Sequence, residues 1–285
     1  MDSNRYLVDL LLKITSPCLI ISSMSSQTLT ARTVRQAVEI MAGSVIFFIA
    51  AAIIAFLIVK AMKYRPAEDQ GVLMVIITAV NSGFMGFPVT KAIFGDQYFF
   101  LMVIQNVVLN FYLYFLAVIQ MNYGQGRSGS LRDVIRPLLN NCTYALLIGL
   151  VILITRWQMP ELVYDFFDTI AGATIPVSMI VVGIQLAESD LKKMLKNGKL
   201  IFASLCNVIL IPVLTLLAVN WLPLTPESKL ILVFAASFPC AVVTVAVSSK
   251  EGRNSGLMAE GVAMTTLFSL ATLPVAAIAL MQLYC

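Results

Sequence analysis

Histidine is absent from this 285-residue chain, and charged residues make up only 12% of it. Without histidine there is no imidazole base and no H-E-x-x-H zinc site, and serine–histidine hydrolysis is excluded. A paired-aspartate protease would need two aspartates that face each other within apolar segments. Asp165 and Asp168 have no evident partners of that kind. We therefore expect no enzyme activity, no metal and no bound cofactor.

Cysteine is scarce and scattered. The five cysteines form no C-x-x-C pair and no plausible disulfide framework. They are predicted to be small buried side chains. They are Cys18, Cys142, Cys206, Cys240 and Cys285.

Hydrophobic residues, by contrast, make up 59% of the chain, and the mean hydropathy is +0.90. A soluble domain carries about 25% charged residues. Nine apolar segments approach or exceed the roughly 20 residues that cross a bilayer. They are 6–24, 40–59, 71–90, 97–126, 137–155, 169–187, 200–226, 230–249 and 261–285. The sequence predicts an all-α polytopic membrane protein of nine helices.

Basic residues are distributed unequally between the connecting loops. Thirteen lie on the side of the N-terminus and five on the other, with Lys13 inside the first segment. The positive-inside rule places the N-terminus in the cytoplasm and the C-terminus outside. We expect the membrane to be a bacterial inner or plasma membrane. The net charge of +4 therefore reflects topology and predicts the lipid bilayer, not nucleic acid, as partner.

The segment 71–90 is interrupted by Asn81-Ser82-Gly83-Phe84-Met85-Gly86-Phe87-Pro88. Such a break is costly in hydrocarbon unless protein or a wet cavity satisfies the freed backbone groups. In transporters, breaks of this kind mark the substrate site.

A short pattern recurs in the two halves of the chain. Thr15-Ser16-Pro17 and Thr174-Ile175-Pro176 are each followed by a later proline inside an apolar segment, Pro88 and Pro239. The matching helices run in opposite directions, which indicates an inverted repeat of four plus five helices. A chance match of so short a pattern is the alternative.

This division predicts a first repeat over 1–121 and a second over 137–285. Between them, 122–136 reads as a cytoplasmic linker because it is rich in glycine and serine.

The interrupted motif resembles the auxin efflux carrier family, which includes plant PIN proteins and bacterial malonate-type carriers. The resemblance extends over nearly the whole chain. It includes Ile175-Pro176-Val177-Ser178 with Gly183, Ala235-Ala236-Ser237-Phe238-Pro239, and Thr272-Leu273-Pro274.

The resemblance implies two inverted five-helix repeats, whose two broken helices cross at mid-membrane. Here those would be 71–90 and 230–249. A moving core would comprise about 40–121 and 198–285. A scaffold of about 6–24 and 137–187 would often form a homodimer.

The sequence departs from the family pattern in two ways. The first family helix has no counterpart, so 137–155 is unpaired. Many relatives also carry an asparagine shortly after the second proline, where this chain offers only Thr244. The substrate type is therefore not carried over.

Each broken helix would restart at mid-membrane with free N–H groups and about half a positive charge, which suits an anion. Asn81 and Ser82 are predicted to hydrogen-bond the substrate, Gly83 and Gly86 to allow close approach, and Pro88 and Pro239 to fix the breaks, with Thr244 a weaker candidate.

Asn106 and Asn110 share a helix face and are predicted either to bond between helices or to support the site. Gln185 is ambiguous between the same roles. Asp9 and Lys13 are expected to pair. No unpaired carboxylate lies inside a segment, which weakens any model of a buried proton relay. Coupling to protons, to sodium or to nothing stays open.

These features together predict a secondary transporter that moves a small organic anion, such as a carboxylate, by an elevator-like movement. Two alternatives remain. One is a membrane sensor that keeps the pocket without transporting. The other is a carrier like the sodium-coupled bile-acid symporters, which share the crossed-helix plan.

Overall fold

The computed structural model describes residues 2–123, 141–187 and 194–284, and it holds no strand in these ranges. The predicted all-α membrane fold is confirmed. Seven helices in the described ranges are long and apolar enough to cross a membrane. The elements are α1 (Asp2–Leu10), η1 (Leu11–Thr15), α2 (Ser16–Ser26), α3 (Ala31–Ala61), η2 (Ala67–Asp69), α4 (Gln70–Thr78), η3 (Ser82–Gly86), α5 (Phe87–Phe94), α6 (Asp96–Phe111), η4 (Tyr112–Leu116), α7 (Ala117–Met121), α9 (Asn141–Thr155), α10 (Glu161–Gly172), α11 (Thr174–Ala187), α13 (Gly198–Leu205), η5 (Cys206–Leu210), α14 (Ile211–Asn220), α15 (Pro226–Ala236), α16 (Val243–Lys250) and α17 (Ser255–Tyr284).

Two helical rods begin earlier than the apolar runs predict. The run at 40–59 is part of α3, which starts at Ala31, and the run at 169–187 is part of a rod that starts with α10 at Glu161. The reason is that helix ends beyond the hydrocarbon carry charged residues, and a hydropathy pattern stops at the first of them. The predicted linker 122–136 lies outside the described residues from 124 onward.

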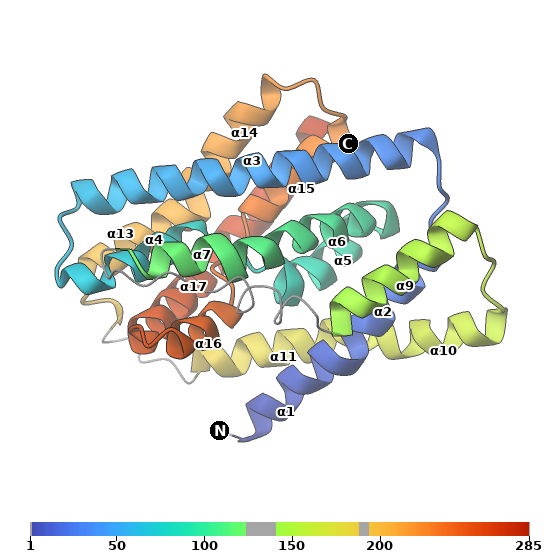
Figure 1. Cartoon of the computed structure of the whole chain (residues 1–285), viewed down its shortest axis with the longest axis horizontal. Coiled ribbons are helices and arrows are strands. Elements are labelled where there is room, and N and C mark those ends of the chain that lie inside the picture. The colour runs from blue at the N-terminus through green and yellow to red at the C-terminus, as the bar shows by residue number, and fades with distance from the viewer. Residues whose placement is uncertain (1, 124–140, 188–193, 285) are drawn as a thin grey trace.

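The helices pack in two groups (Figure 1). In one group α2 lies against α9 and α10, and α11 contacts α1 and α10. In the other, α3 packs on α4, α6 and α15, while α17 packs on α13, α15 and α16. We call these the α2 group and the α3 group. Contacts between them run from α2 to α6 and from α11 to α5, η3 and α17.

Close approach inside the α3 group depends on small residues. A Cβ added at Gly71 of α4 would lie 2.3 Å from the carbonyl oxygen of Gln120 in α7. The backbones of these helices are therefore nearly in contact. Such small-residue packing is how helices associate where lipid supplies no hydrophobic driving force.

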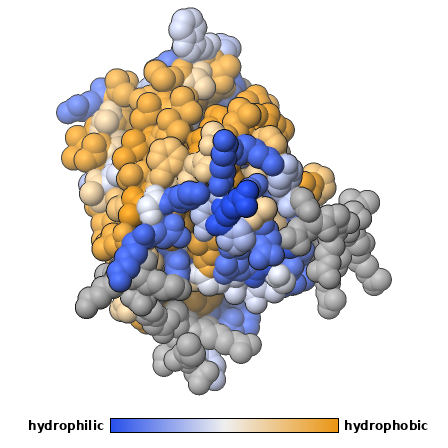
Figure 2. All heavy atoms as spheres, turned by 90° about the vertical axis from the view of Figure 1, so that its left-hand side faces the viewer, coloured by the Kyte–Doolittle hydropathy of each residue, from blue (hydrophilic) through white to orange (hydrophobic). Residues whose placement is uncertain are grey.

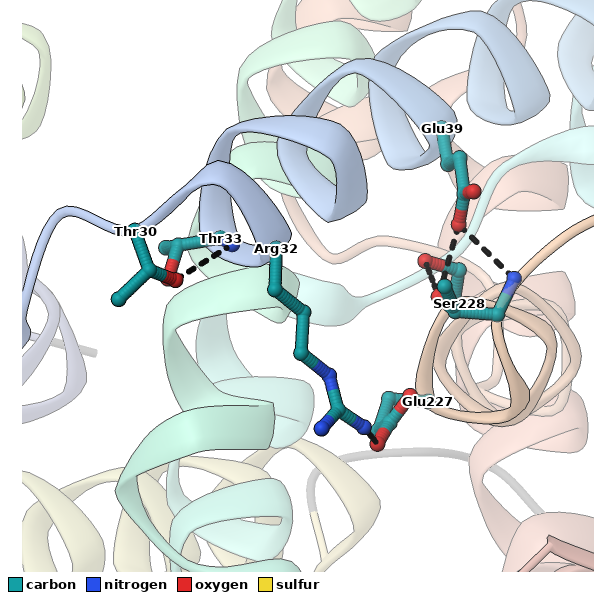
Figure 3. Close-up of polar contacts among 7 residues, drawn as sticks. Thr30, Arg32, Thr33, Glu39, Glu227 and Ser228 are labelled. Carbon is teal, nitrogen blue, oxygen red and sulfur yellow. Dashed lines mark hydrogen bonds and ion pairs between the residues drawn. The ribbon is translucent and has the colours of Figure 1, made fainter.

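A polar cluster ties the start of α3 to the start of α15 (Figure 3). Glu39 Oε2 accepts hydrogen bonds from the Thr225 amide at 3.0 Å and from its hydroxyl at 2.7 Å. The Thr225 hydroxyl also lies 2.8 Å from Ser228 Oγ, and Arg32 pairs with Glu227. Thr225 is the N-cap of α15, so a carboxylate stabilises the positive end of this helix.

A second polar cluster ties the opposite ends of the same group. Figure 2 views the end at the left of Figure 1 and shows hydrophilic side chains gathered beside a broad apolar flank. Asn122 donates to Glu251 Oε2 at 3.0 Å and accepts from Arg253, while Asn254 donates to Asp69 Oδ2 at 3.0 Å. Both ends of the α3 group thus join residues from the two halves of the chain.

Candidate binding site

The first interruption separates α4 from η3. The helix ends at Thr78, and Asn81 has a non-helical backbone with φ −100° and ψ 55°. The Asn81 side-chain oxygen caps the restarted helix by accepting from the Phe84 amide at 3.3 Å. The other amide atom, Nδ2, is buried with no partner among the described residues. Pro88 follows within the first turn of α5, where a missing N–H costs least.

The carbonyl end of α4 is closed by a residue that the sequence analysis did not single out. Asn207 in η5 is fully buried, and its Nδ2 donates to the carbonyl oxygens of Ile77 at 3.0 Å and Ala79 at 3.1 Å. These carbonyls lie at the helix end, where intrahelical partners are missing. The sequence feature that could have pointed to Asn207 is the presence of an asparagine inside the apolar run 200–226.

The second interruption separates α15 from α16. The helix ends at Ala236, residues 237–242 are not helical, and Pro239 lies among them. Thr265 of α17 accepts from the Cys240 amide at 3.1 Å. The Thr244 hydroxyl donates to the Ala241 carbonyl at 2.6 Å. Side chains therefore satisfy freed backbone groups at both interruptions, as the membrane interior requires.

The two interruptions meet at one cavity of about 150 Å³. Asn81 and Gly83 line it from the first, and Ala241 and Val243 line it from the second. The starts of η3 and α16 therefore border the same space. The Ser82 and Gly83 amides donate to no residue in the part of the chain that the structure describes.

The cavity lies between the α2 group and the α3 group. Leu12, Ser16 and Cys142 contribute from the α2 group, while Asn106 and Asn110 contribute from α6. Most of the remaining lining is apolar, and none of the described lining residues is charged. Free helix amides are consequently the source of positive potential there.

Three polar side chains behind the first interruption form a connected network. Asn110 Nδ2 donates to the Asn106 carbonyl at 2.8 Å and to Asn106 Oδ1 at 3.1 Å. Asn106 Nδ2 in turn donates to Ser82 Oγ at 3.1 Å. The bond from Asn106 to Ser82 joins α6 to η3, so the predicted bonding between helices is present for Asn106, whereas the bonds of Asn110 stay within α6. Both asparagines also line the cavity.

Of the other predicted residues, Ser82 is fully buried and lies outside the cavity lining. Gly86 serves the packing of the two interruptions, because a Cβ there would lie 3.3 Å from the Phe238 ring. Pro88 and Pro239 are buried at the two interruptions, again outside the lining.

Thr244 is buried and serves the second interruption through its bond to a carbonyl, without reaching the cavity. Gln185 belongs to α11, but its side chain lies outside the described residues. The predicted pair of Asp9 and Lys13 is confirmed at 2.8 Å. Cys18, Cys206 and Cys240 are buried as predicted, whereas Cys142 is half-buried; Cys285 is not described.

An ion pair links the two packing groups near the end of α5. Lys91 Nζ lies 3.8 Å from Asp168 in α10 and 3.4 Å from Asp96 in α6. The Ser22 hydroxyl of α2 donates to Asp168 at 3.2 Å. The contact with Asp168 crosses from the α3 group to the α2 group, while the contact with Asp96 stays within the α3 group.

A membrane fold with a cavity at two helix interruptions is typical of transport proteins. The profile of the membrane transport protein family matches residues 1–133 and 130–277. The chain therefore belongs to this family, the auxin efflux carrier family, as its motifs predicted.

Two archaeal relatives are similar to the chain. An uncharacterized transporter of Methanocaldococcus jannaschii is 24% identical over 222 residues, which cover 76% of this chain and 71% of the relative. An uncharacterized transporter of Methanothermobacter thermautotrophicus is 25% identical over 205 residues, covering 71% of this chain and 65%, just under two thirds, of the relative.

Proposed function

We propose that this protein is a secondary transporter of a small organic anion. The observation that carries the proposal is that the starts of η3 and α16 border one uncharged cavity. Each helix start carries about half a positive charge. A carboxylate in the cavity would therefore meet two positive ends without needing lysine or arginine.

The hydrogen-bond donors at the first interruption support this choice. Asn81 Nδ2 and the amides of Ser82 and Gly83 are without described partners. Unpaired buried donors are costly unless an acceptor reaches them. A carboxylate supplies acceptors only, so it matches this set better than a cation does.

The position of the cavity supports an elevator-like movement. It lies between the α2 group, which would be the scaffold, and the α3 group, which holds both interruptions and would be the moving core. Sliding one group against the other would carry the cavity across the membrane. The ion pair of Lys91 with Asp168 would have to separate in each cycle.

The same proposal includes an inverted repeat whose interrupted helices cross at mid-membrane. It also places the N-terminus in the cytoplasm, and the scaffold helices would carry any homodimer contact. Transport, with coupling to protons or sodium left to experiment, would be the whole activity, with no enzymatic step.

Replacing Asn81 with alanine tests the function. In proteoliposomes, the unchanged protein should transport at least one small carboxylate from a panel of acetate, lactate, malonate and succinate. Asn81→Ala should abolish the flux, because it removes both a donor to the ligand and the cap on the Phe84 amide. Asn220→Ala, at the exposed end of α14, is the matched control and should transport normally.

Size-exclusion profiles must show that both variants insert and fold alike. Ligand binding without flux in the unchanged protein would favour a membrane sensor over a carrier. Full flux in Asn81→Ala would refute the proposed site.

A further inference from the structure

The orientation of one amide at the cavity is determined by its surroundings. Asn110 places an amide atom 2.8 Å from the backbone carbonyl of Asn106. A carbonyl oxygen only accepts, so this atom is Nδ2, and the opposite orientation would set oxygen against oxygen. The same Nδ2 donates to Asn106 Oδ1, which in turn fixes the Asn106 amide with Nδ2 toward Ser82.

The amide of Asn110 has one other polar atom, Oδ1. Its Oδ1 accepts no hydrogen bond from any described residue, and Asn110 lines the cavity. The hydroxyls of Ser16 and Tyr114 also line this cavity, but they rotate and can serve as donor or acceptor. Asn110 cannot rotate its amide without losing two bonds. It therefore holds an acceptor of fixed orientation in the cavity wall.

We propose that Asn110 determines specificity by selecting anions that carry a hydrogen-bond donor beside the carboxylate. This rests on the proposed function, since the carboxylate is taken to occupy the interruptions. An ammonium group as donor is disfavoured, because none of the described lining residues is a carboxylate that could pair with it. Neutral donors remain, and a hydroxyl is the smallest of them, which makes small hydroxy acids the ligand class.

The volume of the cavity limits the size of the ligand. A cavity of about 150 Å³ is of the size that admits one benzene molecule in another protein. Lactate and pyruvate each have as many non-hydrogen atoms as benzene. They differ at one position, where lactate carries a hydroxyl and pyruvate a carbonyl oxygen. A difference in binding between lactate and pyruvate therefore measures the effect of the hydroxyl donor.

The experiment measures the binding of four probes to the detergent-solubilised protein by titration calorimetry. They are lactate, pyruvate and the uncharged amides of both, lactamide and pyruvamide. Lactate should bind roughly three- to tenfold more tightly than pyruvate, the range that one neutral hydrogen bond supplies. Asn110→Leu, which keeps the branching of the side chain but has no acceptor, should remove this preference, while Asn220→Leu should keep it.

Each outcome supports or overturns the role of Asn110, the proposed anion site, or both. A hydroxyl preference in both pairs, with the charged pair bound more tightly, supports the inference and the anion site together. A hydroxyl preference without an anion preference supports Asn110 but refutes the proposed substrate charge. Equal binding of lactate and pyruvate, or a hydroxyl preference that persists in Asn110→Leu, overturns the inference alone. Binding of none of the four overturns both.

Discussion

Asn207 should hold the first interruption together, and replacing it with leucine tests this. The side chain is fully buried and joins η5 to the carbonyl end of α4 through two hydrogen bonds, at 3.0 and 3.1 Å. Leucine has the same branching and number of side-chain non-hydrogen atoms, but it is bulkier and has no donor. Asn207→Leu therefore leaves the carbonyls of Ile77 and Ala79 without partners, and it also removes the buried Oδ1 atom of Asn207, which has no described partner.

Two reference values bound the loss of stability. Side-chain hydrogen bonds between membrane helices average about 0.6 kcal/mol, so two of them set a lower limit of about 1.2 kcal/mol. A buried acceptor left unsatisfied costs about 1–3 kcal/mol, so two carbonyls set an upper limit of about 6 kcal/mol. Because a helix end has no other partner to offer these carbonyls, we expect a loss of about 2–4 kcal/mol.

The free energy of unfolding in mixed detergent–SDS micelles, followed by circular dichroism, measures this loss. Ser204→Ala is the matched control, because Ser204 is buried one turn earlier on the same rod and its hydroxyl has no described partner. It should change stability little. A loss below about 0.5 kcal/mol for Asn207→Leu would refute the reasoning, since it would fall under even the average for one such bond.

Two further predictions concern the second interruption and the contact between the helix groups. Thr265→Val should lower the free energy of unfolding by about 1 kcal/mol in the same assay, because the Cys240 amide loses its acceptor; no loss would show that the amide finds another partner. Lys91→Met should change the transport rate by up to about fivefold, because a part-exposed pair with Asp168 contributes about 0–1 kcal/mol to one conformation. Asp96→Asn, which removes only the contact within the α3 group, is the control, and an equal effect from it would refute a role in the movement.

The membrane class, the apolar segments and the interruption at Asn81 could be predicted from the sequence. Composition alone separates a membrane chain from a soluble one, and glycine and proline act on the backbone where they stand. Motifs around Pro88 and Pro239 likewise identified the family before any fold was known. These properties are local, which is why one sequence is enough to find them.

The contents of the candidate site were only partly predictable. Asn81, Gly83, Asn106 and Asn110 were singled out and do line one cavity. Other predicted residues, such as Thr244, are buried nearby with structural bonds of their own. Residue type and position along a helix do not say which side of a break faces open space.

Partners distant along the chain were decided by the tertiary structure alone. Asn207 reaches a carbonyl 130 residues away, and Thr265 reaches an amide 25 residues away. The amide of Asn110 took its orientation from a neighbouring carbonyl. The position of a helix break is determined by local glycine, asparagine and proline residues. The groups that satisfy its open backbone, and the space it borders, depend on which helices pack beside it.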